Sequence, residues 1–170
     1  MSVVQSARVP LLSTFLVLAL AVGCTVTPTG TSDTPGAAPP APPDACGADP
    51  FVHVYHPARL KVLVACRTIT GTIDFIRREP DGDDHVRLRV DDVSLLNQGN
   101  IDNQHGDLVL EPVCINPVTQ EDAKSACAGY RSDVVVPPAG SRVSVTGPWV
   151  LDTEHGWNEI HPVVRISVLP

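Results

Sequence analysis

Apolar and polar residues alternate along several stretches of this chain, which is typical of strands that bury one face. The clearest stretch is residues 67–76, R-T-I-T-G-T-I-D-F-I, which is rich in β-branched residues. Residues 85–90 alternate as well, with valine or leucine at every second position. Between them, residues 79–84 contain Pro followed by Asp-Gly-Asp, which favours a tight turn. These residues therefore predict a β-hairpin.

A second hairpin is predicted at residues 149–163, W-V-L-D-T-E-H-G-W-N-E-I-H-P-V. Its first strand is the end of a run that begins at Arg142, and the polar group 152–156 ends in glycine, as turns often do. Side chains of a regular second strand alternate between faces, so Trp157, Glu159 and His161 share one face. We therefore expect Glu159 and His161 to be neighbours.

The rest of the pattern completes an all-β domain. Residues 107–113 predict a further strand, residues 91–106 are polar and predict a long loop, and Thr119 is expected to start one short helix between Cys114 and Cys127. About five strands with one short helical insert favour a small OB-like barrel, and a β-sandwich is the alternative.

The N-terminus has the pattern of an export signal. Residues 11–23 form an uncharged apolar run that is shorter than the roughly 20 residues needed to span a bilayer. Leu20-Ala21-Val22-Gly23-Cys24 resembles a bacterial lipobox, although that motif has Leu where this chain has Ala21. We therefore predict a lipoprotein signal peptide at residues 1–23 and acylation, for example by palmitate, at Cys24. Ordinary cleavage after Ala21 is the alternative.

Residues 24–45 are predicted to be the lipid anchor followed by a linker. The segment consists mainly of Pro, Thr, Ala and Gly, which cannot bury enough apolar surface to fold. Residues 46–170 are then the folded domain. This organisation predicts a protein anchored by lipid to a bacterial cell membrane, with its domain on the extracytoplasmic side.

The cysteines support the same compartment. The chain has five cysteines, and acylation of Cys24 leaves an even number, as expected of an exported domain. Four cysteines allow three pairings. We favour Cys114 with Cys127, which would clip the insert, and Cys46 with Cys66, which would fix the start of the domain to the first strand.

The charge of the chain argues against one class of partner. The formal net charge is −7 at pH 7, and aromatic residues make up 4% of the chain. An acidic surface repels phosphate backbones and few rings are present to stack on bases, so nucleic acid is not an expected partner.

From about Tyr55 onward, the chain resembles a group of largely uncharacterised exported prokaryotic proteins with an OB-like domain. The most characteristic matches are the D-G-D-x-H motif at residues 81–85 and the D-x-x-H-G-W-x-E-I-H-P motif at residues 152–162. The resemblance implies a β-barrel and supplies no activity.

The same motifs hold the candidate site residues. Carboxylates and imidazoles are suitable ligands for a divalent ion such as zinc or manganese. The Asp-Gly-Asp turn also resembles the metal-binding turn of thermonuclease-type OB-folds, but that family continues with Thr where this chain has Asp84. The candidate metal or ligand residues are Asp81, Asp83, His85, Asp152, His155, Glu159 and His161.

Three functions remain open at this point. The leading hypothesis is a binding module for an extracytoplasmic ligand or protein, with a bound metal ion as an option, and this hypothesis makes the chain a binding protein rather than an enzyme. A metal-dependent hydrolase of phosphoesters or glycans is the second, and it requires the candidate residues to converge in one cleft. A passive accessory lipoprotein is the third, because turns and strand pairing alone also account for these residue types.

Overall fold

The computed structural model of the chain describes residue 42 and residues 45–170. The predicted signal peptide, Cys24 and most of the predicted linker therefore lie outside the described residues. Among the residues described, no helix is long and apolar enough to cross a membrane.

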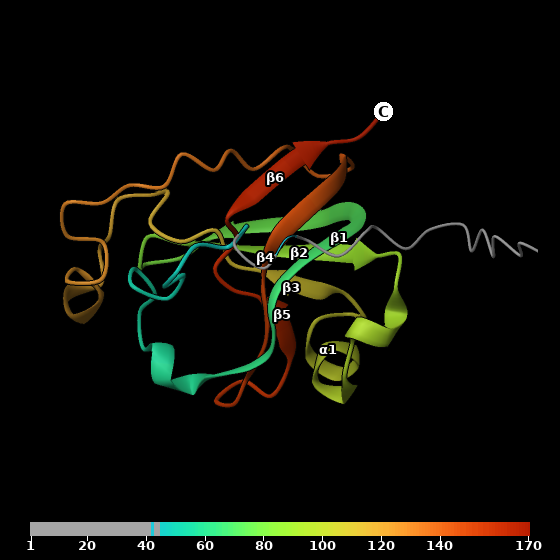
Figure 1. The fold of residues 1–170 in the computed structure, drawn as a ribbon, viewed down its shortest axis with the longest axis horizontal. Helices are drawn as coiled ribbons and strands as arrows, with labels where there is room; N and C mark the ends of the chain where they lie inside the picture. The colour runs from blue at the N-terminus through green and yellow to red at the C-terminus, as the bar shows by residue number, and fades with distance from the viewer. Residues whose placement is uncertain (1–41, 43–44) are drawn as a thin grey trace, which may run out of the picture. The chain divides into compact units, whose positions relative to one another are not determined.

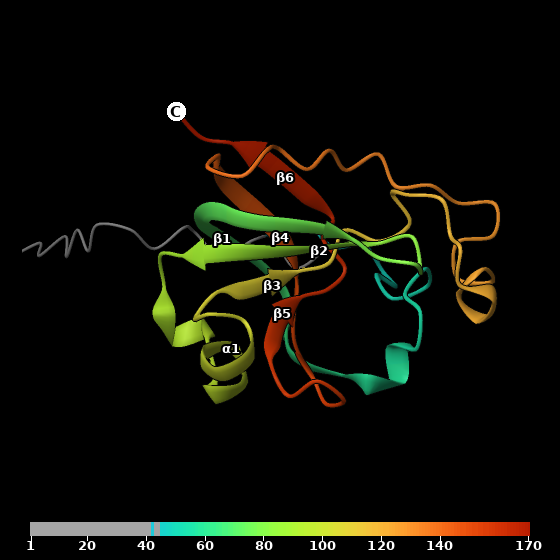
Figure 2. The same ribbon diagram turned by 180° about the vertical axis from the view of Figure 1, so that it is seen from behind.

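The described domain is a six-stranded sheet in which five strands close into a ring (Figures 1 and 2). The strand order is β1-β2-β3-β5-β4-β6, and β1 also pairs with β4. All paired strands are antiparallel except β3 and β5, which are parallel. The ring confirms the predicted OB-like barrel and excludes the β-sandwich. The strands are β1 (Leu60–Arg78), β2 (Asp84–Val90), β3 (Leu108–Leu110), β4 (Arg142–Asp152), β5 (Asn158–Ile160) and β6 (Arg165–Val168).

The long strand β1 closes the ring because it pairs with β4 over most of its length and with β2 over its second half. Gly71 pairs with both neighbours, and a Cβ there would lie 2.6 Å from the carbonyl oxygen of Arg89. Register shifts between Val62 and Arg67 and between Ile73 and Phe75 act as β-bulges, which bend a strand. The firm strand predicted at 67–76 is thus the middle of a longer one.

The core fills the ring with residues from the inward faces of the strands. The alternation predicted for β2 is observed, because Val86, Leu88 and Val90 are buried in it. Other fully buried contributors are aliphatic residues of β1, β3, β4 and β5 together with Leu95 before the helix, namely Ile73, Leu95, Leu108, Leu110, Val143, Val145 and Ile160.

The short α-helix lies where the sequence predicted a loop. α1 spans Gln98–Asn103 and follows a 3-10 turn at Val93–Leu95. Asn97 caps the helix and forms a capping box with Asn100, whose side chain is completely buried. A buried asparagine in place of an apolar stripe gives no helical periodicity, which is why the sequence pattern indicated a loop.

The helix predicted from Thr119 is wrong, since the segment between β3 and β4 has only a 3-10 turn at Glu121–Ala123. The backbone N–H groups of Thr119 and Gln120 instead donate to the carbonyl oxygen of Pro80, at 2.8 and 2.9 Å. Docking onto the β1–β2 turn therefore replaces the first helical turn. The segment, coloured yellow to orange, extends to one side of the barrel (Figures 1 and 2).

The N-terminal part of the domain has a 3-10 turn at Pro57–Arg59, and the weak alternation of residues 51–57 does not produce a strand. Both predicted disulfides are present, Cys46–Cys66 and Cys114–Cys127. The first joins the start of the domain to β1, and the second closes the segment after β3.

Candidate functional site

A pocket of about 100 Å³ lies beside the β4–β5 hairpin, and most of its lining side chains are ionisable. We call it the acidic pocket. The hairpin turn is the one predicted, because the N–H of Gly156 donates to the carbonyl oxygen of Asp152 at 2.8 Å. The lining residues are spread along the sequence of the domain, and they are Arg59, Arg77, Glu79, His85, Glu111, Asp152, His155, Trp157 and Glu159.

Glu111 and His85 form the innermost pair of the pocket. Glu111 follows β3, and its Oε1 lies 2.9 Å from Nδ1 of His85 on β2. Nε2 of His85 lies 3.0 Å from Oε1 of Gln104. Burial, with the nearby charge of Glu159, raises the pKa of Glu111 well above its usual value, whereas burial lowers the pKa of His85. Both shifts disfavour the charged side chains, so a cation in the pocket would compete with a proton for Glu111, whereas the neutral form of His85 is already favoured.

Glu79 brings a second carboxylate to this pair. One ligand atom from each of Glu79, His85 and Glu111 lies within 4.8 Å of the other two. Oxygen and imidazole nitrogen at such a separation are donors that a single divalent ion can share. Glu79 also accepts a hydrogen bond from Arg77, at 2.6 Å. The group is therefore a candidate metal site, and it includes only His85 of the residues predicted from the sequence.

Glu159 is held rigidly on β5, at the register position where β5 pairs with both β3 and β4. Its Oε1 lies 2.9 Å from Nδ1 of His161, and its Oε2 accepts a hydrogen bond of 3.0 Å from Nε1 of Trp157. The expected neighbours Glu159 and His161 are thus in contact. His161 is 1% exposed and is not among the residues lining the acidic pocket. Its Nε2 is buried, with no hydrogen-bond partner among the described residues.

Asp152 and His155 form an oriented pair at the edge of the acidic pocket. Oδ2 of Asp152 lies 2.8 Å from Nδ1 of His155 and accepts a 2.8 Å bond from Nε of Arg59. Although burial acts to raise it, hydrogen bonds from His155 and Arg59 bring the pKa of Asp152 below its usual value. The side chain of His155 is 51% exposed and stacks on Trp157, with ring centroids 4.6 Å apart. This arrangement leaves an exposed imidazole fixed by a buried carboxylate.

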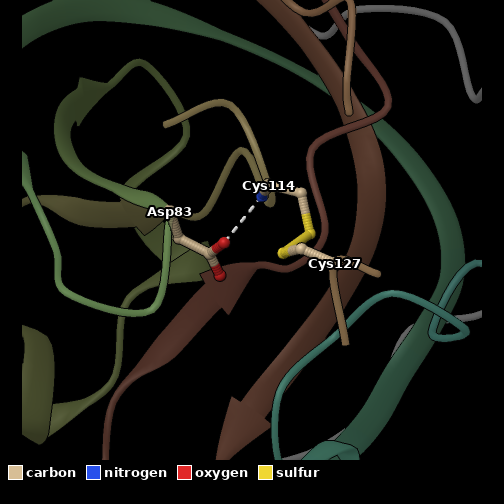
Figure 3. Close-up of side chains that lie close together, drawn as sticks. All are labelled: Asp83, Cys114 and Cys127. Atoms are coloured by element: carbon tan, nitrogen blue, oxygen red, sulfur yellow. Dashed lines mark hydrogen bonds between the residues drawn. A yellow bond between two sulfur atoms is a disulfide. The ribbon is translucent and has the colours of Figure 1, made fainter. Parts of the chain in front are cut away.

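Asp81 and Asp83 do not line the acidic pocket. Oδ1 of Asp81 accepts a hydrogen bond from the N–H of Asp83, which stabilises the β1–β2 turn. Asp83 is buried and accepts a 2.7 Å bond from the N–H of Cys114, as Figure 3 shows. Burial and the neighbouring Asp81 raise the pKa of Asp83 to about 8. Cys114 and Cys127 lie beside Asp83, but their sulfurs form a disulfide and supply no thiolate to a metal.

The structure therefore brings together four of the seven predicted residues, namely His85, Asp152, His155 and Glu159. His161 contacts Glu159 without lining the pocket, while Asp81 and Asp83 stabilise the β1–β2 turn. Sequence reasoning missed Glu79, Glu111, Arg59 and Arg77. A signal for Glu111 was present, because a carboxylate that directly follows the fully apolar strand Leu108–Leu110 needs a partner when buried.

Comparison with known proteins gives no match, either to a protein-family model or to a curated protein.

Proposed function

We propose that this chain is a lipid-anchored extracytoplasmic protein whose OB-like domain binds a ligand at the acidic pocket, with a divalent metal ion held by Glu79, His85 and Glu111. The observation that carries the proposal is the clustering of three ligand atoms from these residues within 4.8 Å of one another. Zinc and manganese both accept such a mixed set of carboxylate and imidazole ligands.

The charges of the acidic pocket support a cation at this place. Of its four carboxyl side chains, Asp152 is paired with Arg59 at 2.8 Å and Glu79 with Arg77 at 2.6 Å. Glu111 and Glu159 have only imidazole partners among the described ion pairs. Their mutual repulsion contributes to the raised pKa of Glu111. A bound divalent ion would relieve this repulsion.

Metal content of the mature chain, with its disulfides formed, tests the proposal. We expect one equivalent of zinc or manganese after dialysis. Because an ion that binds only the folded state stabilises it by about 2.7 kcal/mol at one hundred times Kd, chelation should lower Tm clearly. A chain that holds no metal, and whose Tm does not respond to zinc, manganese or a chelator, would contradict the metal site and favour a passive accessory lipoprotein.

A matched pair of variants assigns the metal to this site. Glu111→Gln keeps the size of the side chain but removes the ligand charge, so it should reduce bound metal at least tenfold. Glu121→Gln makes the same chemical change at an exposed glutamate that does not line the acidic pocket, and it should bind metal as the unchanged chain does. Equal metal content in the two variants would place the ion elsewhere.

A metal-dependent hydrolase is the second candidate, and the pair of Asp152 with His155 favours it. A general base must lie beside the reacting water and have a defined orientation, and the imidazole of His155 is oriented by Asp152 and lines the acidic pocket. Screening with phosphodiester and glycan substrates in the presence of manganese tests this function. A His155→Ala variant should then lose turnover while keeping bound metal. If the chain turns over neither substrate class, the hydrolase is refuted and the binding module remains the proposed function.

A further inference from the structure

A larger groove adjoins the acidic pocket on the outer face of β1 and β2. Its volume is about 480 Å³, which lies within the range of small-molecule sites. Its floor consists of two cross-strand pairs, Phe75 with Arg87 and Arg77 with His85. Arg77, His85 and Trp157 line both the groove and the acidic pocket, so the two spaces are neighbours that share these side chains.

The groove has a local surplus of positive charge in an otherwise acidic chain. None of the described side chains that line it is a carboxylate. Arg87 and Arg89 share one counter-charge, Asp74, at 3.3 and 3.8 Å. The next carboxylate, Asp107, lies 4.0 Å from Nε of Arg87, at the outer limit of an ion pair. An anion entering the groove therefore meets the incompletely neutralised guanidinium of Arg87, beside Arg77, whose one carboxylate partner in the described part of the chain is Glu79.

Aromatic surface lies beside these cations. Phe75 is 39% exposed, although it belongs to a strand that buries its other face in the core. The guanidinium of Arg87 lies over its ring, 4.7 Å from the centroid. Trp157 lies where the groove meets the acidic pocket. A ligand that carries an anionic group next to a flat apolar ring can use both features at once.

We propose that the groove binds a small phosphate monoester that carries an aromatic ring, with its phosphate near Arg77 and Arg87 and its ring against Phe75. A phosphate monoester has a charge between about −1.5 and −2 at pH 7, and the planar fork of arginine matches its oxygens. The inference rests on the proposed function, because it names the ligand class of the same module. A cation held beside His85 would add positive charge at the inner end of the groove.

Titration calorimetry of the mature chain with phenyl phosphate, inorganic phosphate and phenol tests this inference, both after chelation and with manganese added. We expect one site for phenyl phosphate, at least tenfold tighter than for inorganic phosphate and tighter still with manganese. Phenol, which lacks the charge, should bind at least a hundredfold more weakly. Phenol binding as tightly as phenyl phosphate, or no binding of phenyl phosphate under either condition, would overturn the assignment.

Two arginine variants provide the matched control. Arg87→Gln should weaken phenyl phosphate binding at least tenfold, whereas Arg165→Gln, on β6 and outside the groove, should change it less than twofold. Should Arg87→Gln fail to fold, Arg77→Gln replaces it, because the side chain of Arg77 is 57% exposed. Equal binding by the groove and control variants would contradict the proposal.

Separate measurement of metal content distinguishes failure of the proposed metal site from failure of the proposed phosphate monoester site in the groove. A chain that holds one equivalent of metal but does not bind phenyl phosphate refutes the groove and leaves the metal site. A chain without metal that binds phenyl phosphate, and loses this binding in Arg87→Gln, supports the groove and refutes the metal site.

Discussion

At the scale of single residues, the buried carboxyl groups of this barrel differ in charge because their partners differ. Asp152 accepts hydrogen bonds from Arg59 and His155, which favour its ionised form. Asp83 is as deeply buried but accepts from one backbone N–H and faces Asp81, so its pKa rises to about 8. Two aspartates of similar burial are therefore expected to affect stability in opposite directions as pH changes.

Asp83 should make the domain less stable as pH rises. Its folded pKa of about 8 exceeds the ordinary value of 3.8, so its contribution is complete below about pH 4 and is lost by about pH 8. For one proton the slope is at most about 1.4 kcal/mol per pH unit. Asp83→Asn keeps the acceptor for Cys114, so its Tm relative to the unchanged chain should rise between pH 4 and pH 8. Parallel Tm curves for the two proteins would show that Asp83 has an ordinary pKa.

His161 should matter for folding rather than for chemistry. Its imidazole is buried and contacts Glu159, so His161→Ala leaves a cavity and removes the partner of the buried Oε1 of Glu159. We expect a loss of roughly 2–4 kcal/mol in the free energy of unfolding, measured by urea denaturation. His155→Ala removes a half-exposed imidazole and should cost less than about 1 kcal/mol. Similar urea midpoints for His161→Ala and the unchanged chain would refute the buried role.

At the same scale, the sequence predicted one contact, within a strand, and missed those that depend on the turn or on strand pairing. Glu159 with His161 follows from alternation along one strand, whereas the contact of Asp152 with His155 was not predicted, although both lie in one turn. The pair of His85 with Glu111 forms only because β2 and β3 are neighbours in the ring, and no local pattern specifies that.

At the scale of elements, hydrophobic periodicity located five of the six described strands and missed the short edge strand β6, whereas the helical segments depend on polar contacts. α1 is organised by Asn100, which uses all of its hydrogen-bonding capacity. Its amide group donates to the carbonyl oxygens of Asp107 and Asn158, and its Oδ1 accepts from the N–H groups of Asn97 and Asn158. The residue joins α1 to β5, next to the hairpin that lines the acidic pocket. Such a contact replaces apolar burial and leaves no periodic signal in the sequence.

Asn100→Ala should therefore destabilise the domain more than loss of the helix cap does. It leaves several buried backbone groups unpaired, at about 1–3 kcal/mol each before relaxation, so we expect a total loss of roughly 3 kcal/mol or more. Asn97→Ala removes the cap and should cost about 1 kcal/mol. Gln98→Ala, an exposed change within the same helix, is the control. Thermal or urea unfolding measures the loss of stability in each variant. Equal losses for Asn100→Ala and Gln98→Ala would contradict the prediction.

At the scale of the whole molecule, the two disulfides fit the export predicted from the N-terminus. Cys46–Cys66 and Cys114–Cys127 use all four cysteines of the described domain, so Cys24 is the remaining one of five. The prediction of acylation at Cys24 rested on an even number of remaining cysteines, and the two observed disulfides are consistent with that number.

Replacement of Cys24 tests the anchor directly. In a bacterial host supplied with labelled palmitate, the unchanged chain should incorporate label and sediment with membranes, whereas Cys24→Ala should do neither, because a chain without its acyl group has no hydrophobic anchor. Cys46→Ala with Cys66→Ala, which removes one disulfide, is the matched control and should still incorporate label. If the unchanged chain carries no label and its mature form begins at residue 22, cleavage after Ala21 is correct. The domain would then be released, and its acidic pocket and groove would act on ligands away from the membrane.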